Sequence, residues 1–194
     1  MEGIVLADKP RGITSGECVR RVKDILKAGK AGHSGSLDGN ASGILLIALG
    51  KALDSMELLM GLDKEYEGII HMHGDFEDGK LKLIARKFTG KIRQTPPRRS
   101  AVARRPRVRE IYSLRILKVS GRDARFRART QAGVYIRRLA ADMGNALGVK
   151  AHLKALKRTC LGPFSLKDCA KLEKLSRKDI MPLERVLERV GTFK

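Results

Sequence analysis

A glycine-rich segment, residues 32–43, places two chemically active side chains on an irregular backbone. It reads Gly-His-Ser-Gly-Ser-Leu-Asp-Gly-Asn-Ala-Ser-Gly, and its four glycines predict a loop with tight turns rather than a regular element. His33 and Asp38 are the groups that it displays. A carboxylate in such a loop can act as a nucleophile or as an acid or base. It can equally be only an Asx-turn former before Gly39, and the local residues leave both interpretations open.

Two common phosphate-binding loops are excluded for this segment. The Gly-Lys-Ser/Thr ending of a P-loop is missing at the required spacing. The dinucleotide fingerprint needs a strand before its glycines and a helix after them, and the neighbouring patterns here are in the wrong places.

The elements before the loop are predicted from local patterns. Residues 3–8 form an apolar run that predicts a buried strand. Thr14-Ser15-Gly16-Glu17 predicts a capping box at the start of a helix that stops near Gly29. The apolar face of this helix is predicted to consist of Val19, Val22, Ile25 and Leu26.

The elements after the loop alternate irregularly between strands and helices. Strands are predicted at 44–49, where no alternation indicates burial on both faces, and at 65–74, 111–119, 124–130 and 151–159. Helices are predicted at 52–60, 81–88 with Gly90 as C-cap, 134–147 ending at Gly148, 167–175 and 182–190. This order predicts a single α+β domain, residues 1–194, around a mixed sheet.

Charge is the strongest compositional signal. Lysine and arginine number 41 against 21 acidic residues, for a formal net charge of +20, which favours a polyanionic partner such as nucleic acid. Between Arg86 and Arg138 there are 18 basic residues and only two acidic ones, Glu110 and Asp123. In residues 124–130 three arginines alternate with apolar residues, which predicts one packed face and one cationic face. Aromatic residues make up 4% of the chain, so recognition of folded RNA by backbone and shape is favoured over base stacking.

Other compositional features predict a soluble, cytoplasmic protein. No apolar run is long enough to span a membrane, and the N-terminus lacks the pattern of a secretory signal. Cys18, Cys160 and Cys169 are odd in number and widely spaced, which favours packed, reduced thiols over disulfides or a zinc site.

Several ordered motifs resemble those of the TruB-type pseudouridine synthases. Residues 32–38 with 42–52 resemble the active-site signature of the family. The further matching motifs are Asp8 to Gly12, Lys64-Glu65-Tyr66, Gln131 to Arg137, Gly148 to Thr159 and Gly162-Pro163-Phe164. Details at residues 73–75 and 97–102 are most similar to the archaeal and eukaryotic dyskerin-type branch, which works in H/ACA guide-RNA particles.

The resemblance implies a fold, an activity and a set of roles. The fold would be a mixed, mostly antiparallel central sheet flanked by helices, and the activity would be isomerisation of a uridine in tRNA or rRNA. Asp38 would be the catalytic aspartate, Tyr66 would lie against the flipped base, and Arg137 would hold Asp38 ionised and oriented. Leu156 would pack on the base, His33 would contact the RNA, and Lys9 would support the site. No cofactor or metal is implied, because the rearrangement is redox-neutral.

Residues 91–109 fall where the family carries an RNA-gripping loop, and this segment is called the basic arm. It has three prolines and eight basic residues, so we expect an arm rather than a core element. The arginines expected to contact phosphates are Arg93, Arg98, Arg99, Arg104, Arg105, Arg107 and Arg109. The expected partner is RNA, with a guide RNA and small accessory proteins as an option, and the chain alone is expected to be monomeric.

The chain departs from the family at two points. Gly39 stands where the family has a proline after the catalytic aspartate, which predicts a less rigid loop. Only 30 residues follow Phe164, so we expect no C-terminal PUA domain.

Alternative interpretations remain for the individual residues. Tyr66 and Leu156 fit ordinary core positions, and Arg137 fits a solvated helix charge. His71 and His73 share one face of a strand and could bind a metal, but the sequence shows no third ligand nearby. The rival function is a non-catalytic RNA-binding or ribosome-assembly protein on the same fold.

Overall fold

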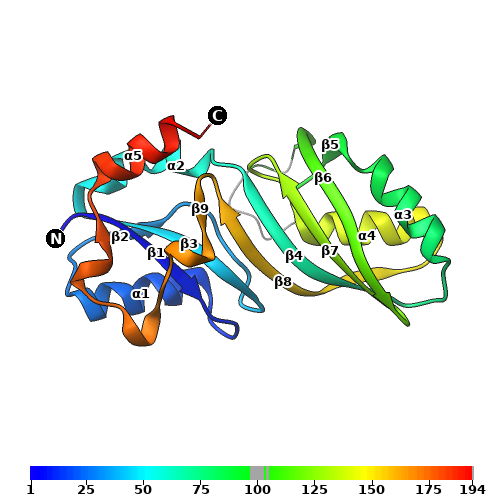
Figure 1. Cartoon of the computed structure of the whole chain (residues 1–194), viewed down its shortest axis with the longest axis horizontal. Helices are drawn as coiled ribbons and strands as arrows, with labels where there is room; N and C mark the ends of the chain where they lie inside the picture. Colours follow the sequence, from blue (N-terminus) through cyan, green and yellow to red (C-terminus); the bar gives the residue numbers. More distant parts are fainter. Residues whose placement is uncertain (97–102, 104, 194) are drawn as a thin grey trace. The chain divides into compact units, whose positions relative to one another are not determined.

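The computed structural model describes residues 1–96, 103 and 105–193. Within it the chain forms two compact units, each described by itself. Unit 1 comprises Met1–Leu62 and Lys157–Lys194, and unit 2 comprises Asp63–Leu156. Strand β8 (Ala151–Leu161) contributes its first residues to unit 2 and its last residues to unit 1 (Figure 1). That the two units act as one catalytic domain stays a prediction.

Unit 1 is built on two long antiparallel strands. Its elements are β1 (Gly3–Lys9), α1 (Ser15–Leu26), β2 (Ala31–His33), β3 (Ala41–Leu49), the 3₁₀ helix η1 (Gly50–Ser55), α2 (Met56–Met60), the end of β8, β9 (Phe164–Ser165), η2 (Leu166–Asp168), β10 (Ala170–Lys171), η3 (Leu172–Lys174), η4 (Arg177–Asp179), β11 (Ile180–Met181) and α5 (Leu183–Gly191). β1 pairs along its full length with Gly43 to Leu49 of β3, and the strand order is β10-β1-β3-β8. Only β10 pairs parallel to β1 among the described pairings of this unit.

Both faces of the β1–β3 pair are covered by helices, which explains why these strands are apolar without alternation. One face packs against α1 and the other against α2 and α5, and Figure 1 shows these helices on opposite sides of the strands. On β1, Val5 and Ala7 belong to the α1 side, whereas Ile4 and Leu6 belong to the other. The prediction of a strand buried on both faces is confirmed for residues 44–49.

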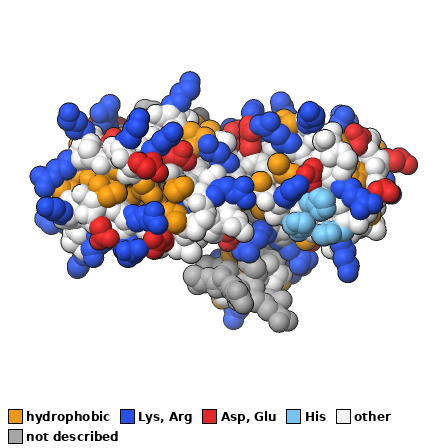
Figure 2. All heavy atoms as spheres, turned by 90° about the horizontal axis from the view of Figure 1, so that it is seen from below, with side chains coloured by type: hydrophobic (Ala, Val, Ile, Leu, Met, Phe, Trp, Pro, Cys, Tyr) orange, Lys and Arg blue, Asp and Glu red, His pale blue; other side chains and the backbone are white. Residues whose placement is uncertain are grey.

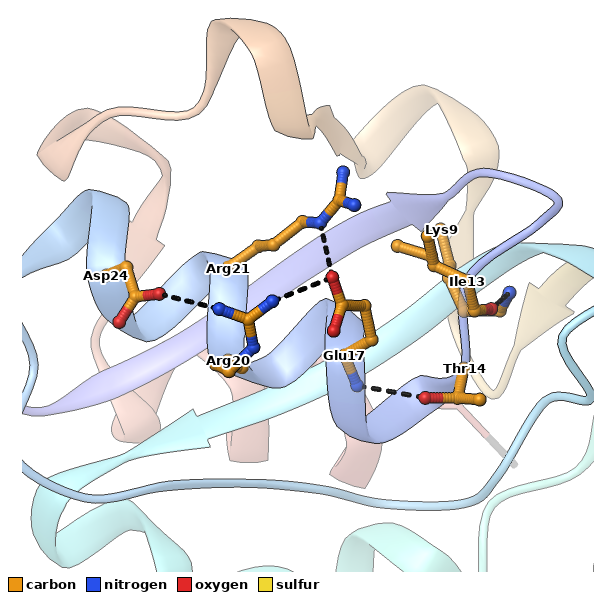
Figure 3. Close-up of polar contacts among 7 residues, drawn as sticks. All are labelled: Lys9, Ile13, Thr14, Glu17, Arg20, Arg21 and Asp24. Atoms are coloured by element: carbon orange, nitrogen blue, oxygen red, sulfur yellow. Dashed lines mark hydrogen bonds and ion pairs between the residues drawn. The ribbon is translucent and has the colours of Figure 1, made fainter.

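Helix α1 begins as predicted but ends and packs differently. The Thr14 hydroxyl accepts a hydrogen bond from the Glu17 N–H at 3.1 Å. The Glu17 carboxylate instead accepts from Arg20 and Arg21, so only half of the predicted capping box forms (Figure 3). The helix ends at Leu26 because Lys27 adopts a left-handed conformation (φ 56°), and Gly29 is not the stop.

The apolar face of α1 also differs from the prediction at Cys18 and at Ile25. Cys18 joins Val22 and Leu26 in the core, whereas Ile25 is 45% exposed. The positions at 18, 22 and 26 are four residues apart and therefore share one helix face. Ile25 lies beside this stripe, so the prediction that it belongs to the packed face, which was based on its apolar side chain, is wrong.

The glycine-rich segment is shorter as a loop than the sequence predicts. β2 extends to His33 and β3 already begins at Ala41, so the irregular backbone is confined to residues 34–40. The predicted helix at 52–60 is a 3₁₀ helix followed by the short α2. The predicted helix at 167–175 is replaced by two 3₁₀ turns with β10 between them, whereas α5 confirms the last helix.

Unit 2 is an antiparallel sheet with two helices. Its elements are β4 (Lys64–Met72), α3 (Asp78–Lys87), β5 (Gly90–Gln94), β6 (Arg107–Ser120), β7 (Asp123–Thr130), α4 (Ile136–Leu147) and the start of β8. The strand order is β8-β4-β7-β6-β5. The predicted β6–β7 hairpin is confirmed, with Ser120 opposite Asp123, and Gly148 ends α4 in a left-handed conformation as predicted. α3 ends at Lys87 with Phe88 as its C-cap, so the prediction of Gly90 as C-cap is wrong; Gly90 already begins β5.

The ends of the basic arm are strands, contrary to the prediction that residues 91–109 form no core element. β5 and β6 pair from Gly90 opposite Ile111 to Gln94 opposite Arg107. Apolar and polar residues alternate only weakly here, because both strands carry many charged residues. The two segments become strands through their pairing with each other.

The predicted fold class is confirmed: the chain is α+β with a mostly antiparallel sheet flanked by helices. Among the described helices, none has the length and apolar character needed to cross a membrane.

Candidate active-site loop

The loop 34–40 of unit 1 is held by hydrogen bonds to four other segments. Ser15 lies at the start of α1, and its buried hydroxyl donates to the Leu37 carbonyl at 3.0 Å and accepts from the Leu37 N–H at 2.7 Å. The Ser34 N–H donates to Leu46 O at 3.0 Å on β3. Leu37 is therefore a buried anchor, and Asp38 next to it is exposed.

The second half of the loop is bound to the turn after β1. The Gly12 N–H donates to Gly39 O at 2.8 Å, and Arg11 Nε donates to Asn40 O at 3.1 Å. Asp38 closes a turn of its own, since its carbonyl accepts from the Ala41 N–H at 2.9 Å. These bonds restrain Gly39 at the position where the family has proline.

Lys9 lies beneath the same turn and is completely buried. Its ammonium donates to Ile13 O at 2.6 Å and to Pro10 O at 2.9 Å. Burial lowers the pKa of Lys9 below its usual value, and attraction to Cys18 and Asp38 opposes that decrease. The predicted supporting role of Lys9 therefore has a physical basis: it holds the turn and contributes positive potential near Asp38.

His33 ends β2 at the entry to the loop and is partly buried. Burial, followed by repulsion from the Arg158 guanidinium, holds the pKa of His33 below its usual value. Its Nδ1 accepts from the Gly35 N–H at 3.4 Å. We therefore expect a neutral ring at physiological pH, able to accept or donate one hydrogen bond.

Arg158 is a site residue that the sequence analysis did not single out. Its side chain is buried, at 2% exposure, near the end of β8. Nε donates to Ile44 O at 2.8 Å and Nη2 donates to Gly35 O at 3.1 Å, so one guanidinium binds the chain before and after Asp38. Its place in the motif 148–159 was the available signal, but surface arginines are so common in this sequence that the signal did not stand out.

The other predicted catalytic residues belong to unit 2. Tyr66 is 8% exposed on β4 opposite Ala128, and Leu156 is partly buried on β8. Arg137 is exposed in the first turn of α4. Because Asp38 belongs to unit 1, the pairing of Asp38 with Arg137 and the contact of Tyr66 and Leu156 with a base stay predictions.

The start of α4 is hydrogen-bonded to β5, the strand at the beginning of the basic arm. Gln94 ends β5, and its amide donates to Tyr135 O at 3.3 Å while its Oε1 accepts from the Tyr135 N–H at 2.9 Å. Tyr135 is the N-cap of α4, two residues before Arg137. Gln94 was also missed by the sequence analysis, because a lone glutamine in a charged segment carries no pattern.

The arginines of the basic arm are only partly described. Arg93 lies exposed on β5, Arg105 and Arg107 are exposed, and Arg109 is partly buried on β6. The predicted contacts Arg98, Arg99 and Arg104 lie outside the described residues.

The predicted cationic face of β7 is partly paired with two acidic residues of unit 2. Glu67 on β4 binds Arg127 at 2.6 Å and Arg125 at 2.8 Å. Arg129 lies 3.9 Å from the Asp63 carboxylate. The cross-strand register places these opposite charges side by side, as Glu67 faces Arg127.

The rings of His71, His73 and His152 contact one another in unit 2, and histidine side chains form one patch on the surface in Figure 2. His73 and His152 share a hydrogen bond of 2.8 Å, and His71 is bonded to Asp123 at 2.6 Å. His152 is the third histidine of this cluster. The sequence analysis did not find it near the other two because it lies 79 positions from His73. Across the described part of the chain, no three His, Cys, Asp or Glu side chains are arranged to hold a metal ion.

The thiols of two cysteines have raised pKa values. Burial raises the pKa of the Cys18 thiol to about 11 and that of Cys169 to about 12, which keeps both protonated and unreactive at neutral pH.

Comparison with solved structures defines the class of the fold. A chain in a crystal structure of a Cbf5-Nop10-Gar1 complex matches with a TM-score of 0.88 and 40% identity, over 96% of this chain and 62% of that chain. A second match, a crystal structure of a pseudouridylate synthase, has a TM-score of 0.56 at 18% identity, over 94% of this chain and 74% of that chain, and supports the fold alone. The fold is that of the pseudouridine synthases.

Sequence comparison narrows the class to a family. Residues 23–79 match the N-terminal domain of the TruB family pseudouridylate synthases, and residues 137–190 match the C-terminal domain of tRNA pseudouridylate synthase B. A probable tRNA pseudouridine synthase B of Methanopyrus kandleri is 48% identical over 85% of this chain. The chain belongs to the TruB family, and the Cbf5 match confirms its resemblance to the dyskerin-type branch.

The chain spans only part of these relatives. It covers 49% of the Methanopyrus protein and 62% of the matched chain in the Cbf5 complex.

Proposed function

We propose that the chain is the catalytic part of an RNA pseudouridine synthase with Asp38 as its catalytic residue. The observation that carries this proposal is the setting of Asp38: an exposed residue on a loop that is hydrogen-bonded to the turn after β1 and to α1, β3 and β8 of unit 1. Preorganisation of this kind keeps a reacting group in place without an entropic cost at each turnover.

The reaction requires only groups that this chain supplies. Asp38 bonds to the sugar carbon or to the uracil ring, the bond from the sugar to N1 breaks, and the base rotates. The bond to Asp38 is broken again as the sugar carbon bonds to C5. The proton lost from C5 is balanced by the one gained at N1. Atoms and electrons therefore balance without an oxidant, an energy donor or a metal.

The roles of the remaining residues follow the family. Arg137 pairs with Asp38 and keeps it ionised, as a fixed guanidinium does for a neighbouring carboxylate. Tyr66 and Leu156 pack against the flipped base, His33 contacts the displaced strand, and Lys9 supports the loop. The flipped base must leave its stack, at a cost of a few kcal/mol.

The substrate is a structured RNA, tRNA or rRNA, bound in part by the basic arm. The name of the Methanopyrus relative supports tRNA, and the Cbf5-Nop10-Gar1 complex supports small accessory proteins as partners. We propose that the chain alone is a cytoplasmic monomer.

The rival function is a non-catalytic RNA-binding or ribosome-assembly protein. An exposed carboxylate among cationic groups weakens attraction for phosphates, so a pure binder gains nothing from Asp38. Turnover by the chain separates the two functions.

The decisive experiment incubates the purified chain alone with tRNA and with unmodified rRNA and maps pseudouridine. We expect one modified uridine in at least one RNA, and Asp38→Asn should lower turnover by about a thousandfold or more while RNA affinity stays within about twofold. Asp24→Asn, which removes an exposed carboxylate on α1, is the matched control and should keep full activity. Turnover retained by Asp38→Asn contradicts the assigned catalytic role.

A second preparation with accessory proteins and a guide RNA tests dependence on partners. Modification that appears only in this preparation would identify the chain as a guided subunit. No modification in either preparation, with RNA binding intact, would favour the rival function.

A further inference from the structure

We propose that Arg158 is a positioning residue, which acts together with Ser15 to hold Asp38 at its working position. This inference rests on the proposed function of Asp38. Both residues are buried in unit 1, and both bind the main chain of the loop that carries Asp38.

The first observation is the span of the Arg158 hydrogen bonds. Nη2 donates to Gly35 O and Nε to Ile44 O, three residues before and six residues after Asp38. The two ends of the Asp38 loop are therefore connected through one rigid, planar group. A lysine keeps the charge at this position but cannot present donors in the same fixed fork.

The second observation is the close packing of the backbone that carries Arg158. Gly43 has φ +104°, and a Cβ built there would lie 2.2 Å from Arg158 O. β3 and the end of β8 therefore touch at their main chains, directly beside the guanidinium. This contact leaves Arg158 little freedom to move away from the loop.

The third observation is the opposite anchor at Leu37. Ser15 both donates to and accepts from the main chain of Leu37, the residue before Asp38. Arg158 and Ser15 thus hold the loop from β8 and from α1. Asp38 directly follows the held residue Leu37 and lies between Gly35 and Ile44, whose carbonyls accept from Arg158. This is the arrangement expected for a reacting group whose misplacement by about 1 Å slows the reaction strongly.

The fourth observation is the electrostatic reach of the guanidinium. Its charge acts on His33 and on Lys9, two of the polar groups near the loop in unit 1. The same residue therefore sets the geometry of the loop and contributes to the positive potential around it.

The test compares Arg158→Lys, Arg158→Met and Ser15→Ala with the natural chain. Arg158→Lys should lower kcat by about a hundredfold with KM within about twofold, because the charge remains while the fork is lost. Ser15→Ala should lower kcat in the same way without any change in charge. In both variants amide exchange at Leu37 should accelerate.

His33 provides a readout that separates charge from geometry. By NMR titration, the pKa of His33 should stay low in Arg158→Lys and rise toward its usual value in Arg158→Met. Arg189→Lys is the matched control, since Arg189 also donates to a main-chain oxygen, Pro163 O, far along the chain from the loop. It should lose stability and keep kcat.

The outcomes distinguish this inference from the proposed function. An inactive natural chain contradicts the proposed function, and the exchange rate of Leu37 then still tests the positioning by Arg158. An active natural chain with unchanged kcat in Arg158→Lys and Ser15→Ala overturns the inference. A lowered kcat with unchanged Leu37 exchange, or an equal loss in Arg189→Lys, overturns it as well.

Discussion

Residues that are distant in sequence surround Asp38 in unit 1. Ser15 reaches the loop across 22 positions and Arg158 across 123 positions of the chain. Gly12 and Arg11 add two further bonds at Gly39 and Asn40. These tertiary hydrogen bonds restrain the backbone around Gly39, which stands where the family has a proline. The lower rigidity of the loop at Gly39 stays a prediction.

Gly43 gives a stability prediction at this scale. Gly43→Ala adds a methyl group against the Arg158 main chain at a left-handed backbone position, so we expect a loss of about 3 kcal/mol or more in the free energy of unfolding. Gly90→Ala is the control, because Gly90 has a similar φ of +100° with nothing within 4 Å. It should lose only about 1–2 kcal/mol. Denaturant unfolding measures both, and equal losses would show that close packing at Gly43 is unimportant.

The elements show where pairing between strands changes the meaning of a residue pattern. The alternation in β7 correctly predicts a packed face of Ala124, Phe126 and Ala128. It also predicts a cationic face, but Glu67 on β4 binds two of its arginines. A strand's own sequence cannot reveal which charges its neighbour provides, because the register is set by the whole sheet.

Glu67 therefore gives a prediction about RNA affinity. Glu67→Gln should release Arg125 and Arg127 for phosphates, so RNA affinity should rise by several-fold and the salt dependence of log K should steepen by about 1–2. Glu173→Gln removes the same charge from unit 1 and should have a smaller effect. Titrations at several salt concentrations measure both. Equal behaviour of the two variants would contradict a specific role for the Glu67 pairs.

The pKa of Glu67 supports the same description. Hydrogen bonds from Arg125 and then Arg127 hold the pKa of Glu67 below its usual value. The paired state is therefore fully present above the usual glutamate pKa of about 4.3 and weakens as the pH falls through the lowered value. Near neutral pH Arg125 and Arg127 therefore stay paired with Glu67.

At the scale of the whole molecule, the net positive charge is the property that most affects the expected affinity for RNA. The formal charge of +20 predicts RNA affinity that falls steeply with salt. Because Arg125 and Arg127 of β7 are paired with Glu67, the basic arm is the better candidate for phosphate contacts, and its Arg93, Arg105 and Arg107 are exposed.

Replacement of Arg93, Arg105 and Arg107 by glutamine tests the arm. We expect the salt dependence of log K to fall by about 2–3 and turnover at low RNA concentration to drop, because three phosphate contacts are lost. Replacement of Lys171, Lys174 and Lys178, exposed lysines of unit 1, is the control with the same change in charge. If both triple variants behave alike, the arm contributes only general charge.

Much of the fold followed from local patterns. The strands at 3–8, 44–49 and 124–130 and the end of α4 at Gly148 were predicted, because apolar periodicity and glycine caps act over a few residues. The errors lie where long-range pairing decides the structure, as at β2 and β5, or where a non-glycine residue adopts a left-handed conformation, as at Lys27.

The sequence by itself determined the family, the fold class and the candidate carboxylate, because ordered motifs and residue types are local properties of a chain. Only the tertiary structure decided which groups hold the loop of that carboxylate and which arginines are paired with acidic side chains. Ser15, Arg158, Gln94 and Glu67 gain their roles from partners between 22 and 123 positions away. Such contacts arise from sheet register and packing, which no short stretch of sequence specifies.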